Sequence, residues 1–284
     1  MNATTDTREP QLTHPNLALL DGTHPGHTLI LGDSGTGKSM DMAHLIAQHA
    51  LDDEPLIVIA GNHQGLAEQA LGLIPPHRKV LWVDPSNPAC PWALGGVSAL
   101  EPGKEPVDII QVWQNRQVLL VHLDEGKLGR ARAGALGRRL LVQLHNALAQ
   151  RVAPGIQGTL MIDEATYLLE ATGMALAENG QALGLRLIVS AQSRDVVTSP
   201  VIRWSLLPNA RQLLAHHTAH GEAAQYIAAH LRIAPPALRQ LTRHAAIGNR
   251  DRADRASIAI HTASPDTPLP YHADWAEHHR QHQP

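Results

Sequence analysis

Short runs of apolar residues recur along the chain and alternate with segments that have a helical pattern. Several of these runs are apolar at every position, which is typical of strands that are buried on both faces of a parallel sheet. The pattern predicts strands at 28–31, 56–60, 80–83, 118–121, 159–162, 187–191, 212–215 and 257–260.

The clearest helical pattern lies at 128–150, where Leu136, Leu140, Leu144 and Leu148 recur every four residues. Shorter helices are predicted at 40–51, 63–71, 107–115, 165–181 and 221–231. Alternating strands and helices form right-handed crossovers. The predicted fold class is therefore α/β, a doubly wound and mostly parallel sheet with helices on both faces.

The organisation along the chain predicts an N-terminal extension (1–25), a single domain (26–264) and a polar tail rich in histidine and proline (265–284). The first ten residues are polar and lack the basic start and apolar stretch of a signal peptide. No run of about 18 apolar residues suits a membrane span. The single cysteine, Cys90, cannot form an internal disulfide. These features favour a cytoplasmic protein.

Charge and aromatic content narrow the class of partner. The 23 Lys and Arg residues against 26 Asp and Glu give a net charge of -3, which excludes a protein that is basic throughout but permits a local basic patch. The aromatic residues are five Trp and three Tyr, with no Phe. So few rings argue against a surface that stacks the successive bases of a single strand.

A glycine-rich loop is the strongest chemical signal. The sequence GDSGTGKS at 32–39 fits G-x-x-x-x-G-K-[ST] between a predicted strand and a predicted helix. In such a loop the backbone N–H groups bind phosphate, Lys38 reaches the outer phosphates and the Ser39 hydroxyl binds Mg²⁺. A glycine-rich turn without a ligand is the alternative. The candidate nucleotide-binding residues are Gly32, Asp33, Ser34, Gly35, Thr36, Gly37, Lys38, Ser39 and Met40.

Two carboxylates follow the buried strand at 159–162. The carboxyl edge of an open parallel sheet is where its ligands bind. Asp163 is the candidate for the Mg²⁺ shell, and Glu164 is the candidate general base that polarises the attacking water. The alternative is that this acidic pair only caps a helix that begins near Ala165.

A polar residue, Gln192, ends the strand predicted at 187–191. If this strand lies between the strands that carry Lys38 and Asp163, its amide would sense the γ-phosphate or position water. The alternative is a glutamine that only satisfies loop backbone.

Together these motifs resemble the FtsK/HerA superfamily of DNA-pumping ATPases, especially the coupling and HerA-like ATPases of conjugation and type IV secretion. The resemblance covers about 26–265 and includes, in the family's order, GDSGTGKS (32–39), KVLWVDPSNP (79–88), QVLLVHLDEGKLG (117–129), LMIDEATYLLE (160–170) and GLRLIVSAQS (184–193). It implies a RecA-like P-loop motor that binds ATP and Mg²⁺ and forms a homohexamer around DNA. By position, the resemblance implies that Asp163 binds the metal ion, that Glu164 activates the water, and that Gln192 is the sensor.

One departure concerns the arginine that many members place before the sensor strand, for use on the nucleotide of the neighbouring subunit. The matching position here is Gln181. Substitutes for this trans-acting arginine are Arg211, which we favour weakly, Arg186 and Arg203. An ordinary surface role is the alternative for each.

Two groups of arginines are candidates for contacts with DNA. The first consists of Arg130, Arg132, Arg138 and Arg139, and the second of Arg243, Arg250, Arg252 and Arg255. Either group facing a pore would bind duplex phosphate without sequence preference. A solvated helix face is the alternative for both.

The sequence therefore predicts an ATP-hydrolysing translocase for double-stranded DNA, of the conjugation, type IV secretion or genome packaging type, with secretion or membrane proteins as further partners. One alternative is a secretion ATPase that energises protein export or channel assembly without binding DNA. Another, suggested only by Gln181, is a switch that binds ATP and hardly hydrolyses it.

Overall fold

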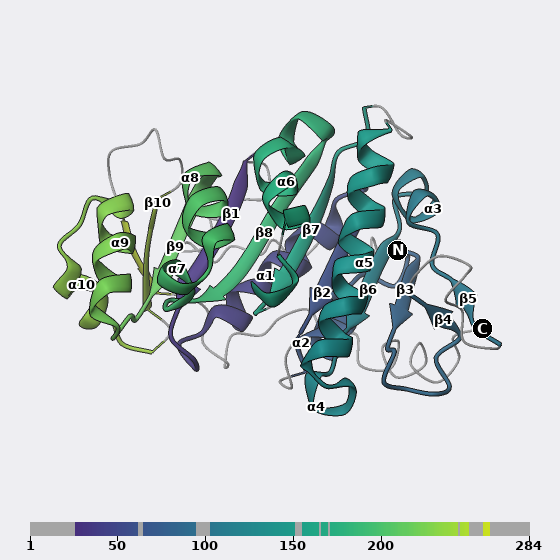
Figure 1. Ribbon diagram of the computed structural model, residues 1–284, viewed down its shortest axis with the longest axis horizontal. Helices are drawn as coiled ribbons and strands as arrows, with labels where there is room; N and C mark the ends of the chain where they lie inside the picture. Colours follow the sequence, from purple (N-terminus) through teal and green to yellow (C-terminus); the bar gives the residue numbers. More distant parts are fainter. Residues whose placement is uncertain are drawn as a thin grey trace, which may run out of the picture.

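The computed structural model describes residues 26–61, 65–94, 103–150, 155–164, 166–169, 171–243, 245–249 and 258–261. Its core is a nine-stranded sheet in the order β11-β10-β9-β1-β8-β7-β2-β6-β3 (Figure 1). The strands from β9 to β3 are parallel, whereas β10 is antiparallel to β9 and to β11. The strands of this sheet are β1 (His27–Gly32), β2 (Leu56–Ala60), β3 (Val80–Val83), β6 (Val118–His122), β7 (Gly158–Asp163), β8 (Leu185–Gln192), β9 (Ala210–His216), β10 (Ala245–Asn249) and β11 (Ile258–His261).

Helices cover both faces of the sheet (Figure 1). The described helices are α1 (Lys38–Leu51), α2 (Leu66–Leu73), α3 (Ile109–Gln114), α4 (Glu125–Leu128), α5 (Arg130–Ala149), α6 (Ala171–Asn179), α7 (Asp195–Thr198), α8 (Leu207–Asn209), α9 (Gly221–Leu231) and α10 (Pro235–Arg239). A separate pair of short strands, β4 (Trp92–Ala93) and β5 (Glu105–Pro106), lies in the connection between β3 and α3.

Alternate residues of each central strand enter different cores, because successive side chains of a strand point to opposite faces. In β2, Ile57 and Ile59 belong to the core that also contains residues of α3, α5, α6 and α9, whereas Leu56 and Val58 belong to the core that contains residues of α1 and α2. All five β2 residues are buried. The apolar runs of the sequence therefore arise from a sheet that has a hydrophobic core on each face.

The predicted fold class is confirmed. Each of the eight predicted strands lies within one residue of an observed strand or inside it, and the predicted helix at 221–231 matches α9 at both ends. The helix predicted at 128–150 corresponds to α5, which begins at Arg130 because Gly129, with φ of 75°, separates it from α4.

The structure differs from prediction at 165–181. A turn of 3₁₀ helix (Thr166–Leu168) comes first, and α6 begins only at Ala171. Leu168 and Leu169 are buried, and Leu168 fills the space that a side chain at Gly137 of α5 would need. Packing against α5 thus holds a segment whose local pattern favours a continuous helix.

The sequence pattern also missed β10 and a π-helix at Val201–Leu206. The β10 segment Ala-Ala-Ile-Gly-Asn has little strand propensity of its own. Gly248 fits there because β9 passes closely, with the carbonyl oxygen of Leu213 at 3.1 Å from where a Cβ would be. The predicted N-terminal extension and tail, 1–25 and 265–284, lie outside the described residues.

None of the described helices combines the length and the apolar character that crossing a membrane requires.

Candidate active site

The phosphate loop occupies the predicted place, between the end of β1 and the start of α1. Gly35 and Gly37 have φ values of 75° and 118°, in the region that favours glycine. Gly32 is required for a different reason, because a Cβ there would lie 2.6 Å from the Cβ of His216. The loop therefore has the left-handed turns and the close packing that its glycines predict.

Lys38 is the first residue of α1, and its side chain is only 3% exposed. Its Nζ donates to the carbonyl oxygen of Asp33 at 2.9 Å and lies 3.4 Å from Oε1 of Glu164. A nearly buried ammonium group is stabilised by such partners. The two residues to which the sequence assigns phosphate binding and water activation are thus in direct contact.

Asp33 ties the phosphate loop to the loops that follow β8 and β9. Its carboxylate accepts hydrogen bonds from the Ser193 hydroxyl and from the backbone N–H of Ala219, the latter at 2.7 Å. The Nδ1 of His217 lies 3.4 Å from the same carboxylate. The side chain of Asp33 therefore holds the phosphate loop in position against these two loops.

Asp163 ends β7 and is fully buried. Its Oδ2 accepts a 3.4 Å hydrogen bond from the Ser39 hydroxyl, and its Oδ1 accepts one from Ser190. Burial raises the pKa of Asp163 to about 6, and Glu164 acts in the same direction, whereas the bonds from Ser190 and Ser39 and the charge of Lys38 oppose it. A buried carboxylate with a perturbed pKa in this position is typical of a functional site.

Glu164 has a left-handed backbone conformation with φ of 49°. For a residue other than glycine this conformation is strained, and such strain is concentrated at functional sites. The N–H of Glu164 donates to Ser190, and its carboxylate turns toward Lys38. The alternative, in which Asp163 and Glu164 only cap a helix near Ala165, is not favoured, because the Asp163 carboxylate accepts from two serines and the Glu164 carboxylate lies beside Lys38.

Gln192 ends β8, which lies between β1 and β7 as the sensor interpretation requires. It is opposite Gly32 in the parallel register of β1 and β8. Its own N–H donates to Asp195 at 3.1 Å. The phosphate loop, the two carboxylates and Gln192 therefore lie at the same edge of the sheet.

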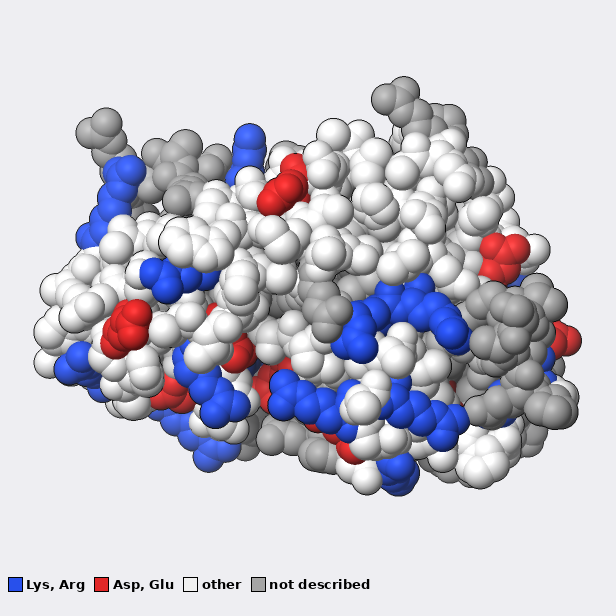
Figure 2. Space-filling model, in the orientation of Figure 1, with Lys and Arg blue, Asp and Glu red and all other residues white. Residues whose placement is uncertain are grey.

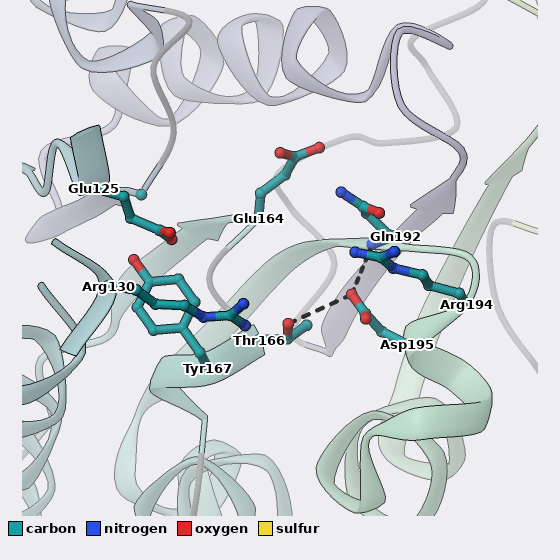
Figure 3. Close-up of a pocket in the computed structure, with 9 residues that line it drawn as sticks. Glu125, Arg130, Glu164, Thr166, Tyr167, Gln192, Arg194 and Asp195 are labelled. Atoms are coloured by element: carbon teal, nitrogen blue, oxygen red, sulfur yellow. Dashed lines mark hydrogen bonds between the residues drawn. The ribbon is translucent and has the colours of Figure 1, made fainter.

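A polar pocket opens beside Glu164 and Gln192 (Figure 3). Sequence analysis missed most of its lining. The additional residues come from segments that follow β2, β6, β7 and β8, and they are Gly61, Glu125, Thr166, Tyr167, Arg194 and Asp195. Their shared position, just after a strand, is the signal that would have found them.

Arg130 also lines this pocket, so one predicted DNA contact lies beside the catalytic candidates. Its guanidinium lies over the Tyr167 ring, 5.2 Å from the centroid. The Tyr167 hydroxyl faces the Glu125 carboxylate in Figure 3. Burial raises the pKa of Tyr167, and Glu125 raises it further, so this hydroxyl stays protonated at neutral pH.

The three candidates for a trans-acting arginine lie in different settings. Arg186 contacts Nδ1 of His49 at 3.1 Å, and Arg203 lies 4.1 Å from the ring centroid of Tyr226 and 4.7 Å from that of Trp204. Arg211 is exposed near the start of β9 and packs over Gly26, at the end of the sheet opposite the phosphate loop. The structure therefore brings none of them to the active site of the same chain.

Basic side chains gather over α4 and α5 on the face shown in Figure 2. Lys127, Arg130, Arg132 and Arg139 are exposed there, and Arg138 is half-buried with a 3.2 Å hydrogen bond to the carbonyl oxygen of Tyr167. We call the exposed basic residues of α4 and α5, which are Lys127, Arg130, Arg132 and Arg139, the α5 basic surface. Of the second group, Arg243 is exposed and the other members lie outside the described residues.

The order of the strands, the loop between β1 and α1 and the acidic end of β7 define the fold as that of RecA-like P-loop NTPases. No protein-family model and no curated protein matches the chain.

Solved structures do match. The chain is similar to the bacterial conjugative coupling protein TrwB, with a TM-score of 0.66 and 12% identity over 86% of this chain and 87% of that one. It is similar to VirB4 of Thermoanaerobacter pseudethanolicus, with a TM-score of 0.60 and 12% identity over 86% and 91% of the two chains. A third is the genome packaging NTPase B204 from Sulfolobus turreted icosahedral virus 2 in complex with AMP, with a TM-score of 0.53 and 14% identity over 85% and 100%. At these identities the likeness concerns the fold.

Proposed function

We propose that this protein is an ATPase that drives the translocation of double-stranded DNA. The contact of Lys38 with Glu164, 3.4 Å apart at the carboxyl edge of the sheet, is the observation that carries the proposal. It unites a phosphate-binding residue with a carboxylate that is suited to water activation.

In the proposed reaction the loop N–H groups and Lys38 hold the β- and γ-phosphates of ATP. Water attacks the γ-phosphorus as its bond to the β,γ-bridging oxygen breaks, and ADP leaves with that electron pair. Glu164 orients the water and accepts its proton, and the Gln192 amide lies at the edge where it can position the same water. The products are ADP and phosphate, and the proton is released when Glu164 ionises again.

The residues around Ser39 fit a Mg²⁺ ion. The Ser39 hydroxyl and the Asp163 carboxylate are 3.4 Å apart, and both are the hard oxygen donors that Mg²⁺ prefers. When bound, the ion would neutralise charge on the β- and γ-phosphates. The Ser190 hydroxyl, which accepts from the N–H of Glu164, donates to Asp163 and holds it in place for this role.

DNA as the substrate is supported by the α5 basic surface and by the names of two similar proteins, a conjugative coupling protein and a genome packaging NTPase. Arginine contacts to phosphate bind a duplex without reading its sequence. If six copies of this surface faced the pore of a homohexamer, a net charge of -3 would be compatible with threading DNA.

The proposal is tested by phosphate release from ATP and Mg²⁺, with and without duplex and single-stranded DNA over a salt series. We expect duplex DNA to stimulate hydrolysis at low salt. Lys38→Ala should lose nucleotide binding and hydrolysis, whereas Glu164→Gln should bind ATP but hydrolyse it about 10²-fold or more slowly. The exposed Arg239→Ala, on α10, is the matched control and should keep wild-type activity.

A hexamer that hydrolyses ATP but ignores DNA at low salt would contradict translocation. The same result, together with direct binding to secretion-channel proteins, would favour the alternative of a secretion ATPase that energises protein export. Multiple-turnover hydrolysis would exclude a switch that only binds ATP.

A further inference from the structure

Arg194 lies two residues after the end of β8, and its neighbour Ser193 contacts the phosphate loop. The N–H of Ser193 donates to the carbonyl oxygen of Gly32 at 3.1 Å, and the Ser193 hydroxyl donates to Asp33. Arg194 is therefore the residue after Ser193, which makes both of these contacts with the phosphate loop. Its side chain enters the pocket that Glu164 and Gln192 line (Figure 3).

In the described part of the chain no hydrogen bond or close ion pair holds the guanidinium of Arg194, although carboxylates of Glu164 and Asp195 line the same pocket. Its charge does act on the Asp195 carboxylate, where it opposes the burial that raises the pKa of Asp195. The Oδ2 of Asp195 is already occupied by the N–H of Gln192 and the Thr166 hydroxyl. By contrast, Arg203 is stacked on two rings, so it is held where it lies.

A positive charge in this pocket would stabilise the transition state of ATP hydrolysis. Negative charge is spread over the γ-phosphoryl oxygens while the bond to the bridging oxygen breaks, and arginine stabilises such charge through paired N–H donors. Gln181, which stands where the sequence resemblance leads one to expect an arginine, carries no charge. Arg194 is two residues from Gln192, and its flexible side chain reaches into the pocket.

We propose that Arg194 is a catalytic residue of its own subunit, whose guanidinium contacts the γ-phosphate of ATP bound at the adjacent phosphate loop. This inference rests on the proposed ATPase function. Asp195 and Thr166 keep the end of β8 in place, and Arg194 extends from that fixed end toward the phosphate.

The first test compares Arg194→Ala, Arg194→Lys and the control Arg239→Ala by steady-state ATP hydrolysis and by equilibrium binding of a fluorescent ATP analogue. We expect Arg194→Ala to lower kcat by about 10²–10³-fold. Nucleotide affinity should change by about threefold or less, because Lys38 and the loop N–H groups remain. Arg194→Lys should recover part of kcat, since it keeps the charge but not the paired donors.

Arg194 is exposed, so its substitution should leave stability almost unchanged, and thermal unfolding of the variants checks this. If Arg194→Ala hydrolyses ATP as fast as Arg239→Ala, the role of Arg194 is overturned while the ATPase proposal stands. A wild-type protein that hydrolyses no ATP overturns the ATPase proposal itself.

The second test shows on which subunit Arg194 acts. Glu164→Gln and Arg194→Ala proteins are mixed in equal amounts and assayed together. If both residues serve the same site, every site in a mixed assembly lacks one of them and activity stays at the level of the separate variants. Recovery of activity on mixing would mean that Arg194 acts on the neighbouring nucleotide, which would overturn the proposal of action within one subunit.

Discussion

His27 shows how one buried side chain makes stability depend on pH. It is 1% exposed at the start of β1, and its Nδ1 accepts a 3.0 Å hydrogen bond from the N–H of Leu187. Burial lowers the pKa of His27 from 6.5 to about 4. The unfolded chain therefore binds this proton more readily, and the stability that is present above pH 6.5 is lost as the pH falls toward 4.

We predict that the free energy of unfolding falls by about 2 kcal/mol through His27 alone between pH 6.5 and pH 5. Burial and Arg186 lower the pKa of His49 to about 3, which adds a loss of the same sign. Urea unfolding at the two pH values should show a smaller loss for His27→Asn, which keeps an acceptor near Leu187. The exposed His77→Asn is the control, and an unchanged pH dependence in His27→Asn would contradict the prediction.

Arg78 acts at the scale of elements, because it joins the end of α1 to the starts of two strands. Its guanidinium donates to the carbonyl oxygens of Ala50 at 3.0 Å and Glu54 at 2.6 Å, and also to that of Asp52. A further bond reaches the carbonyl oxygen of Arg116, just before β6, at 3.1 Å. It thereby satisfies carbonyl groups that a helix end leaves without partners.

We predict that Arg78→Leu lowers the free energy of unfolding by roughly 2–4 kcal/mol, because four carbonyl groups, of which one is buried and three are partly buried, lose their donor. Arg116→Gln is the control for the loss of an arginine. Arg116 forms a 3.0 Å ion pair with Asp53, and both side chains are exposed. Such a pair contributes about 1 kcal/mol at most. Equal effects of the two substitutions in urea unfolding would contradict a special role for Arg78.

At the scale of the whole molecule, charge is distributed unevenly despite the net value of -3. Arg132 and Arg139 are exposed on the α5 basic surface, whereas Arg232 and Arg239 are exposed around α9 and α10 at the far end of the molecule (Figure 1). Changing either pair to glutamate alters the net charge equally. Only the first pair should matter for DNA if the α5 basic surface binds it.

We predict that Arg132→Glu with Arg139→Glu weakens binding to duplex DNA and reduces the slope of log affinity against log salt by about 2. Fluorescence anisotropy over a salt series measures both quantities. The double variant Arg232→Glu with Arg239→Glu should bind nearly as the wild type does. An equal loss in both double variants would mean that net charge, rather than this surface, governs binding.

Local sequence was sufficient where a short segment carries its own physical requirement. The apolar runs predict the buried strands because both faces of the sheet are covered. The glycines of the phosphate loop predict its turns, since Gly35 and Gly37 adopt positive φ. Asp163, Glu164 and Gln192 could be found because carboxyl ends of parallel strands share one edge.

Long-range packing decided the rest. No local pattern places β8 between β1 and β7, makes β10 antiparallel, or interrupts the helix predicted at 165–181. Nor does sequence distinguish Arg203, stacked on aromatic rings, from Arg194, which lines the pocket beside Glu164. By itself the sequence determined the buried parallel strands, the phosphate loop and the polar residues at the ends of β7 and β8, because those depend on neighbours in the chain. Only the tertiary structure decided which of those groups meet, because that depends on contacts between segments far apart in sequence.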